Sequence, residues 1–518
     1  MTRLYKFIDK YENMPIGLGL WLASVFFIIF IRDGFESIVI NRSWSTPDSF
    51  HLLHFPLFFF SLFLAIIVAL HLFSKTDIVK VSKISLVFFC IIIFPVTFDF
   101  IFANLAKNKT AYLYIESNLW ENLPRFFDFA HDSPDFPRSI RIEIAMIILM
   151  SFGYIYLKRR KIFSAFSGAL TVFILCFLAV SLPAVLKEIF KLLGFLLSKI
   201  NLQISPFPSG PMDESILVLL QLLTITALGL FWLRRFDILK YQAIIKNARL
   251  TRSLHYCILC LLGVLIKYLD LPVEDVFLPI RIAGALLAVF FAFHFSVVIN
   301  DLFDIDCDRL SNKDRPLITG ALNKKEYLNI GCVFLCLSLL FAYWVSESCV
   351  MIILLFIALY FVYSAQPFRL KRLFPISACI IGLEAVFAFA AGEAALDRPI
   401  ASSYFHGYLF WPIFLIFSLG SNIKDLKDVQ GDRAMGVVTL PILLGEDAGR
   451  KVIAFLVFLS YCLVPYFLRQ LFPGTKLLLL SLCFALASFV YILNKKGKEK
   501  IIFVIYFAYV LLLVVLLR

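Results

Sequence analysis

Long hydrophobic runs recur along the whole chain, and short polar segments separate them. A helix that crosses a membrane needs about 20 mostly apolar residues. Segment 185–200 follows Pro183 and is amphipathic, so we expect it to lie at the membrane interface rather than to span. The other runs predict fifteen transmembrane helices, at 16–32, 53–74, 84–105, 140–157, 163–184, 214–233, 253–270, 280–300, 326–345, 349–364, 375–395, 404–421, 451–468, 475–493 and 501–517. The chain is therefore expected to be an all-α integral membrane protein.

Composition and charge support this interpretation. The sequence is 61% hydrophobic and 16% charged, whereas a soluble domain has about 25% charged residues. The net charge is +13, and 33 of the 49 Lys and Arg residues lie in loops on the same side as the N-terminus. Such a bias places those loops in the cytoplasm. It explains the positive charge without nucleic-acid binding, which we do not expect.

Two features near hydrophobic runs have ordinary explanations. The run at 16–32 follows acidic residues and Pro15, and no small-residue cleavage site comes after it. We therefore predict a first transmembrane helix rather than a cleaved signal peptide. Cys257 and Cys260 form a Cys-x-x-Cys pair inside an apolar run, without a second pair nearby. Packed thiols are the expected state, and no disulfide or metal site is indicated.

A basic, polar stretch at 234–252 divides the chain into two expected domains. Residues 1–240 form a six-span region of unknown function, and residues 241–518 form a nine-span region. The first region contains Asp99 within a span but no cluster of acidic residues. A non-catalytic role in lipid transport or as a scaffold is therefore one hypothesis for it.

The unusual polar residues gather in two predicted cytoplasmic loops of the second region. The first loop supplies Asn300, Asp301, Asp304, Asp306, Asp308, Arg309, Lys313 and Arg315. The second loop supplies Lys424, Asp425, Lys427, Asp428, Asp432 and Arg433. Each set begins where an apolar span ends.

The spacing of the carboxylates suggests a shared task. Asn300, Asp304 and Asp308 would share one face of a continuing helix, as would Asp425, Asp428 and Asp432 in the second loop. Stacked carboxylates repel one another unless a cation lies between them. Oxygen-rich, thiol-free ligand sets suit Mg²⁺, which also binds substrate phosphates. Two such clusters with flanking Arg and Lys predict a site that stabilises a departing pyrophosphate.

Two other interpretations of the acidic residues fit the sequence less well. Aspartates at helix ends can cap a helix or be solvated, but two clusters on the same predicted side favour a common site. A calcium loop over Asp304, Asp306 and Asp308 fails, because Arg309 stands at the glycine position and Arg315 at the glutamate position.

The two loops resemble the motifs of the UbiA-type prenyltransferase superfamily over about 245–518. The first motif is matched by Asn300, Asp301, Asp304, Asp308, Arg315, Pro316 and Gly320. The second is matched by Lys424, Asp425, Asp428, Gly431, Asp432, Arg433, Thr439, Leu440, Pro441 and Gly445. The segment YSAQPFRLKR is similar to a third family motif through Tyr363, Arg369 and Lys371. Ser421 replaces a Tyr found in many members, and Gln366-Pro367 replaces a double Pro; both bear on the acceptor.

The resemblance implies a nine-helix bundle around a central cavity that opens sideways to lipid. It implies Mg²⁺-dependent transfer of a prenyl group from a polyprenyl pyrophosphate to an aromatic or lipid acceptor, within a prokaryotic plasma membrane and with the site facing the cytoplasm. Catalysis and metal binding would fall to Asp304, Asp308, Asp428 and Asp432, with Asp425 as a further metal ligand. The substrate-binding residues would be Asn300, Asp301, Arg315, Tyr363, Arg369, Lys371, Lys424 and Arg433.

Alternatives stay open at this point. Some family members resemble phosphoribosyltransferases that use a polyprenyl phosphate as acceptor, and the same clusters would serve them. Glu384 lies within a span and could orient or deprotonate an acceptor, or make a structural hydrogen bond. His294 is expected to be a satisfied residue of the bundle. Protein partners are unknown from the sequence.

Overall fold

Every described element of regular structure in the computed structural model is a helix. The structure describes residues 2–516 except 42–50, 103–113, 115–118, 129–136, 199–213, 271–277, 397–406, 428, 435, 469–474 and 495–498. Within these residues, 15 helices are long and apolar enough to cross a membrane. The predicted all-α membrane fold and its fifteen spans are thereby confirmed. The chain divides into two compact units, Met1–Tyr241 and Gln242–Arg518.

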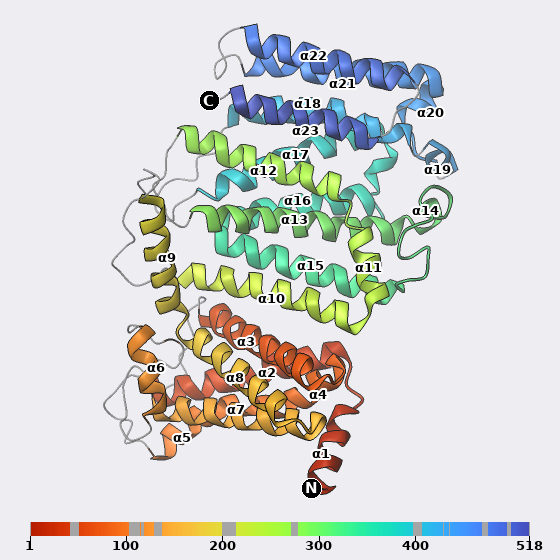
Figure 1. Cartoon of the computed structure of the whole chain (residues 1–518). Coiled ribbons are helices and arrows are strands. Elements are labelled where there is room, and N and C mark those ends of the chain that lie inside the picture. Colours follow the sequence, from red (N-terminus) through yellow and green to blue (C-terminus); the bar gives the residue numbers. More distant parts are fainter. Residues whose placement is uncertain are drawn as a thin grey trace. The chain divides into compact units, whose positions relative to one another are not determined.

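Helices of the first unit pack around an aromatic core. They are α1 (Thr2–Glu12), α2 (Leu18–Asn41), α3 (His51–Ser74), α4 (Ile78–Phe89), η1 (Cys90–Ile93), α5 (Phe94–Phe102), α6 (Leu119–Phe127), α7 (Arg138–Arg159), α8 (Ile162–Val180), α9 (Leu182–Ser198) and α10 (Glu214–Phe236). Helix α11 (Ile238–Lys246) carries the boundary between the units. Helix α9 includes residues 185–198 of the predicted amphipathic segment, and it runs across the direction of α10 (Figure 1).

Charged side chains are buried inside this first unit. The Arg32 side chain is 1% exposed and donates to Glu36 at 2.5 Å. Its guanidinium also lies 4.6 Å from the ring centre of Phe55 and 4.5 Å from that of Phe59. Asp99, whose partner the sequence did not reveal, accepts a hydrogen bond from Ser139 at 2.7 Å. Intramembrane charges are costly unless paired, and these pairs show how the unit tolerates them.

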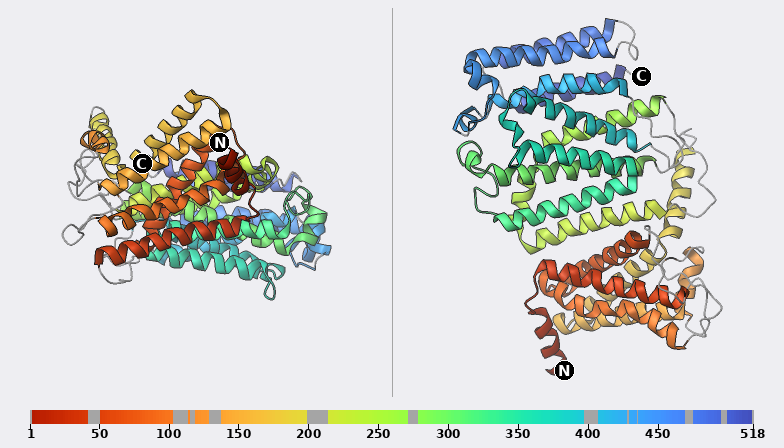
Figure 2. Two further views of the ribbon diagram at one scale, coloured as in Figure 1. Left: turned by 90° about the horizontal axis from the view of Figure 1, so that it is seen from below. Right: turned by 180° about the vertical axis from the view of Figure 1, so that it is seen from behind.

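The second unit is a bundle of roughly aligned helices (Figures 1 and 2). Its long helices are α12 (Leu250–Asp270), α13 (Leu278–Phe303), α15 (Lys324–Val345), α16 (Glu347–Ser364), α17 (Ile376–Ala394), α18 (Phe410–Gly420), α21 (Glu446–Phe467), α22 (Thr475–Leu493) and α23 (Glu499–Leu516). Together with the short η4, which α18 runs into, these account for the nine candidate spans among the described residues of this unit. The bundle matches the nine spans expected for residues 241–518.

Small residues let the helices of the bundle approach closely. A Cβ atom added to Gly392 of α17 would lie 1.8 Å from the carbonyl oxygen of Cys260 on α12. One added to Gly263 would lie 2.0 Å from the carbonyl oxygen of Phe389. Glycine is common at such interfaces, because it allows two backbones to touch. The α12–α17 contact places both helices against the cavity described below.

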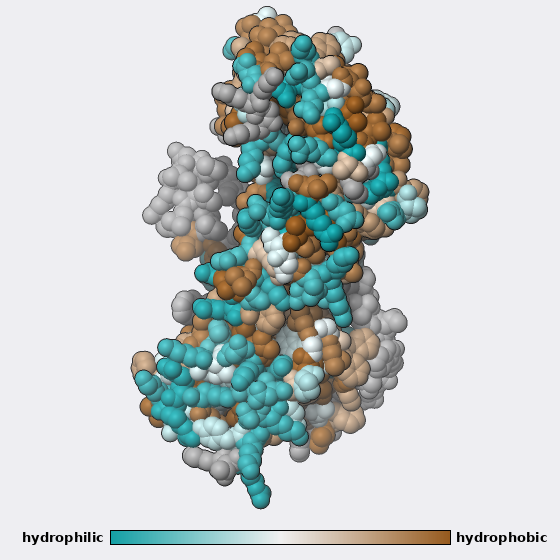
Figure 3. All heavy atoms as spheres, turned by 90° about the vertical axis from the view of Figure 1, so that its right-hand side faces the viewer, coloured by the Kyte–Doolittle hydropathy of each residue, from teal (hydrophilic) through white to brown (hydrophobic). Residues whose placement is uncertain are grey.

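Short elements that carry the motif residues gather at one end of this bundle. They are α14 (Ile305–Ser311), η2 (Leu370–Arg372), η4 (Ser421–Leu426), α19 (Val429–Ala434) and α20 (Leu440–Leu444). The short η3 (Gly407–Leu409) directly precedes α18 and carries no motif residue. Helices α14 and α19 lie close together although more than 100 residues separate them in sequence (Figure 1). The surface of this end is rich in polar residues (Figure 3). The two sequence motifs therefore meet.

Candidate active site

The first motif does not form one continuous helix. Helix α13 ends at Phe303, and Asp304 adopts φ −109° and ψ 14° before α14 begins. The expectation that Asn300, Asp304 and Asp308 share one helical face is therefore wrong. The break has a physical reason, since carboxylates stacked on one face repel one another. It allows Asp304 and Asp308 to pair with different cations.

Asp304 is held by two basic side chains from the third motif. Arg369 donates to its Oδ1 at 3.0 Å, and Lys371 pairs with its Oδ2. Lys371 also lies 3.4 Å from the Asn300 amide oxygen, which accepts from Ser364 at 3.2 Å. Arg369 is in the left-handed region at φ 42°, which turns the loop so that its side chain reaches inward. The third motif thus supplies cations to the first.

Asp308 is paired with Arg315, a residue of the same motif. Arg315 donates to its Oδ2, and Asn312 donates to its Oδ1 at 3.2 Å. The side chain is nearly buried, at 3% exposure. Burial raises the pKa of Asp308 to about 6, although the Arg315 guanidinium acts in the opposite direction. This carboxyl therefore changes its charge near neutral pH.

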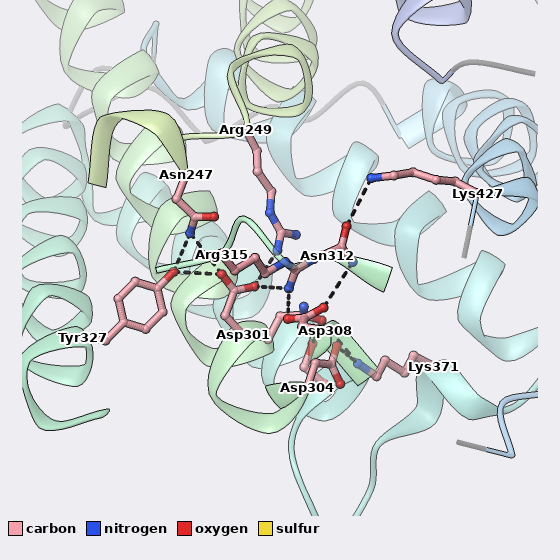
Figure 4. A network of polar contacts seen from close by, with 12 residues as sticks. Asn247, Arg249, Asp301, Asp304, Asp308, Asn312, Arg315, Tyr327, Lys371 and Lys427 are labelled. Atoms are coloured by element: carbon pink, nitrogen blue, oxygen red, sulfur yellow. Dashed lines mark hydrogen bonds and ion pairs between the residues drawn. The ribbon is translucent and has the colours of Figure 1, made fainter. Parts of the chain in front are cut away.

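Asp301 lies on a different side of α13 and is surrounded by donors (Figure 4). Two arginines, Arg249 and Arg315, each donate to its Oδ1 at 2.5 Å. Its Oδ2 accepts from Asn247 at 3.0 Å and from the Tyr327 hydroxyl at 2.8 Å. Asp301 is 1% exposed and is not among the residues that line the cavity. Its carboxylate ties the start of α12 to α13 and α15.

The second motif folds as a short 3₁₀ turn followed by α19. The Lys424 ammonium donates to the Tyr363 hydroxyl at 2.7 Å and lies 5.0 Å from the centre of its ring. Lys427 reaches across to Asn312 at 3.3 Å, which links the two motifs (Figure 4). The sequence-predicted ligand Asp428 lies outside the described residues. Asp425 is on the 3₁₀ turn and Asp432 on α19, so these two residues belong to different helical elements; the face expected to include Asp428 lies outside the described residues.

A cavity of about 370 Å³ opens beneath these residues. Its polar end is lined by predicted site residues: Asn300, Asp304, Asp308, Arg315, Tyr363, Arg369, Lys371, Lys424, Asp425 and Asp432. The remainder is largely apolar and aromatic, with side chains such as Leu259, Phe293 and Phe389. Arg433 is exposed and does not line the cavity. A charged end joined to an apolar chamber suits a molecule that carries an anionic head on a hydrocarbon tail.

The residues at the polar end fit a magnesium ion together with a diphosphate. Their oxygen donors are carboxylates and the Asn300 amide, which Mg²⁺ prefers. No group of three acidic, His or Cys side chains in the described part of the chain could hold a metal alone. A Mg²⁺ ion usually takes one or two carboxylates and completes its shell with water and phosphate. The buried Nε of Arg369 has no described hydrogen-bond partner, so it remains available to an anion.

Several residues at this end were missed by the sequence reasoning. Asn247, Arg249 and Tyr327 hold Asp301, and Tyr256 of α12 donates to Glu384 of α17 at 2.8 Å. The positions 247 and 249 fall in the basic stretch that had been interpreted only as a link between domains. The sequence signal for these two residues was a polar stretch that directly precedes an apolar helix. No comparable signal marks Tyr327, because a lone Tyr at the start of a span is common.

Two residues singled out in the sequence have structural contacts. Both ring nitrogens of His294 lie near main-chain carbonyl oxygens, at 2.7 Å from Phe290 and 2.9 Å from Ala248. His294 does not line the cavity. Glu384 is fully buried, and its Oε1 has no described partner. Tyr256, which bonds to its other oxygen, does line the cavity.

Comparison with known proteins identifies relatives of the second unit. The model of the UbiA prenyltransferase family matches residues 261–512. A digeranylgeranylglyceryl phosphate synthase of Methanocaldococcus jannaschii is 30% identical over 224 residues, which are 41% of this chain and 75% of that protein. The synthase of the same name from Thermococcus sibiricus is 30% identical over 171 residues, or 32% of this chain. The match spans 57% of the Thermococcus protein's own length.

A solved structure is also similar to this chain. It is a UbiA homolog from Archaeoglobus fulgidus bound to GPP and Mg²⁺. The sequences are 22% identical, and the match covers 52% of this chain and 98% of that chain with a TM-score of 0.41.

Proposed function

Because the chain belongs to the UbiA prenyltransferase family, we propose that it transfers a prenyl group from a prenyl pyrophosphate to a lipid acceptor within the membrane. One observation carries the proposal. The motif loops around 300–315, 363–371 and 424–432 converge on the charged end of one cavity, whose remainder is apolar. The pyrophosphate would bind at the charged end, and the prenyl chain would lie in the apolar chamber.

The cations of this end would hold the pyrophosphate. Arg315, Arg369, Lys371 and Lys424 all line the cavity. Charge-assisted hydrogen bonds from Arg and Lys to phosphate are about twice as strong as neutral ones. When the allylic C–O bond breaks, the electron pair goes to the pyrophosphate, and fixed donors around it stabilise the leaving group. The carboxylates now paired with Lys371 and Arg315 would be released to a divalent ion.

Mg²⁺ is proposed as the cofactor. Asp304, Asp308, Asp425 and Asp432 would hold it, with Asp428 as a further candidate from the sequence motif. The ion would neutralise part of the negative charge of the pyrophosphate. Asn300 would orient the same phosphate end through its amide. Tyr363, which lines the cavity and accepts from Lys424, would keep that ammonium aimed at the phosphate.

A lipid is favoured as the acceptor. The similar curated proteins are named digeranylgeranylglyceryl phosphate synthases, and their product is a lipid. The cavity is apolar away from its charged end, which suits a lipid that enters from the bilayer. An aromatic acceptor, or a polyprenyl phosphate that receives a phosphoribosyl group, would appear as other products in the test below.

The test is product analysis in membranes that contain the full chain. Geranylgeranyl pyrophosphate and geranylgeranylglyceryl phosphate are supplied with Mg²⁺, and lipids are analysed by mass spectrometry. We expect a doubly prenylated product from the natural chain, and a loss of at least 100-fold in Asp304→Asn and Asp432→Asn. Asp306→Asn is the matched control, because Asp306 belongs to the same loop but is exposed and does not line the cavity. Full activity in Asp304→Asn would contradict the proposed site.

We propose that residues 241–518 carry this activity as one domain and that residues 1–240 form a separate, accessory membrane domain. The positive charge of the loops favours an active site on the cytoplasmic side, and we propose that the membrane is a prokaryotic plasma membrane. Expression of residues 242–518 alone tests the division. Transfer by that fragment would support an accessory role for the first domain, whereas loss of folding would make it structural.

A further inference from the structure

His255 faces the cavity from α12 without any hydrogen bond to a described residue. Its Nδ1 is buried and unpartnered, and the residue lines the cavity. The ring lies among aromatic neighbours, with ring centres 5.1 Å from Phe417, 5.3 Å from Tyr506 and 6.0 Å from Phe503. A histidine in such surroundings offers hydrogen-bonding capacity that the protein itself does not use.

Tyr506 of α23 shows the same feature on the adjacent wall. Its hydroxyl is buried and has no partner among the described residues, and it lines the same cavity. A buried polar group without a partner costs about 1–3 kcal/mol. Two such groups with rings in contact, at one place in a binding cavity, indicate that a ligand completes their hydrogen bonds.

The pair lies beside the charged end of the cavity but does not belong to the motifs. Arg252 lies one helical turn before His255, and it pairs with Glu499 at 2.6 Å. Tyr506 follows Glu499 by seven residues on α23, which is about 10 Å along a helix. Because His255 lies only one turn past Arg252 and its ring centre is 5.3 Å from that of Tyr506, the pair lies where the charged end passes into the apolar part of the cavity. The motif residues that would hold the pyrophosphate come from other elements.

The chemistry of the pair selects its ligand. A prenyl chain is a hydrocarbon and would leave both polar groups unsatisfied. A phosphate in direct contact with the pair is disfavoured, because Arg252 is already paired with Glu499 and the other neighbours are aromatic; a phosphate one carbon away could still reach the cations of the charged end. A hydroxyl can donate to a ring nitrogen and accept from a phenol at once.

We propose that His255 and Tyr506 form a subsite that binds the free hydroxyl group of the lipid acceptor. The proposal rests on the proposed function and adds the group of the acceptor that is recognised. The subsite would discriminate a lipid with a free hydroxyl from one without it, because the latter leaves both residues unpaired. Neither residue belongs to the family motifs quoted above.

The experiment compares binding of two lipids to the full chain. Affinities are measured for geranylgeranylglyceryl phosphate and for its deoxy analogue, which lacks the free hydroxyl. Tyr506→Phe and His255→Phe remove the hydrogen-bonding groups and keep the rings. We expect each variant to bind the hydroxyl lipid about 5–10-fold more weakly, while the affinity for the deoxy analogue and for Mg²⁺–geranyl pyrophosphate changes less than twofold. A structural defect would weaken all three ligands.

Tyr509→Phe is the matched control. Tyr509 also lies on α23 and lines the cavity, but its hydroxyl is paired with Ser481 at 2.7 Å. It should leave the preference for the hydroxyl lipid unchanged. If the natural chain and Tyr506→Phe bind the hydroxyl lipid with equal affinity, the subsite is refuted, even if His255→Phe does not fold. The subsite is also refuted if the natural chain does not bind the hydroxyl lipid. Binding without prenyl transfer would overturn the proposed function alone.

Discussion

Replacing Asp301 by Asn should destabilise the second unit far more than replacing its neighbour Asp306. Asp301 is 1% exposed and accepts four hydrogen bonds, two of them from the guanidinium groups of Arg249 and Arg315. An asparagine of the same shape has one oxygen and one NH₂ group. The two guanidinium groups at its Oδ1 can only donate, and the Asn247 amide group donates to its Oδ2, so an NH₂ group in either position would meet a donor.

The size of the loss follows from the burial of these groups. Removal of one partner from a buried ion pair costs about 3–5 kcal/mol. The lower end applies here, since Arg315 keeps its pair with Asp308 and the Arg249 side chain is 18% exposed. A loss of about 3 kcal/mol in a domain of this size lowers the melting temperature by roughly 6–12 °C.

The assay can use the protein's own thiols. All eleven cysteines are free, so a thiol-reactive dye reports unfolding in detergent micelles. Asp306→Asn is the control, because the side chains of Asp306 and its partner Arg309 are 75% and 67% exposed, and such surface pairs contribute about 0–1 kcal/mol. If Asp301→Asn melts within 2 °C of Asp306→Asn, the carboxylate is not the structural centre inferred here. A normal melting temperature with weakened Mg²⁺ binding would instead make Asp301 a ligand.

Three further changes test other parts of the structure. Gly392→Ala should lower the free energy of unfolding by about 3 kcal/mol or more, because its Cβ would lie 1.8 Å from the Cys260 carbonyl oxygen. Gly420→Ala is the control in the same thermal assay: its Cβ would have no heavy atom closer than 3.8 Å, so the loss should be under about 1 kcal/mol. Lys371→Met should weaken binding of geranyl pyrophosphate about tenfold or more, because a charged hydrogen bond to phosphate contributes about 1.5–3 kcal/mol, and calorimetry would measure it. Burial raises the pKa of Asp308 to about 6, and a metal binds only the carboxylate form. The Mg²⁺ concentration for half-maximal activity should therefore rise as the pH falls from 7 to 5. In Asp308→Asn this concentration should depend less on pH.

The hydrophobic pattern was sufficient to predict the spans but not all of their ends. The third span was expected at 84–105, and the structure begins it at Ile78. Lys80 and Lys83 made the first turns look like a loop, yet Asp77 caps this helix by accepting from the main-chain N–H groups of Val79 and Lys80. Long basic side chains can extend to the interface while their backbone stays helical. Windowed hydropathy does not register either effect.

The candidate site was predictable in its composition but not in its internal pairing. The motifs predicted that two acidic loops meet, and the structure brings α14 and α19 together. Helical periodicity also contained an unused signal. Asp301 is one residue from Asn300, so on α13 it turns about 100° away from Asn300, which lines the cavity. Its partners could not be predicted, because Asn247 and Tyr327 become its neighbours only when α11, α13 and α15 are packed.

The charge balance of the cavity predicts that the metal ion and the prenyl pyrophosphate bind together. Among the described residues that line it, six are Arg or Lys and five are Asp or Glu, which leaves a formal charge of +1. A prenyl pyrophosphate carries roughly three negative charges at neutral pH, and unpaired charge at a membrane boundary is costly. The lining residues cannot neutralise this ligand alone, and a divalent ion alone would add uncompensated positive charge. Calorimetric titration with geranyl pyrophosphate should therefore show at least tenfold tighter binding with Mg²⁺ than with EDTA, and equal affinities would refute the coupling.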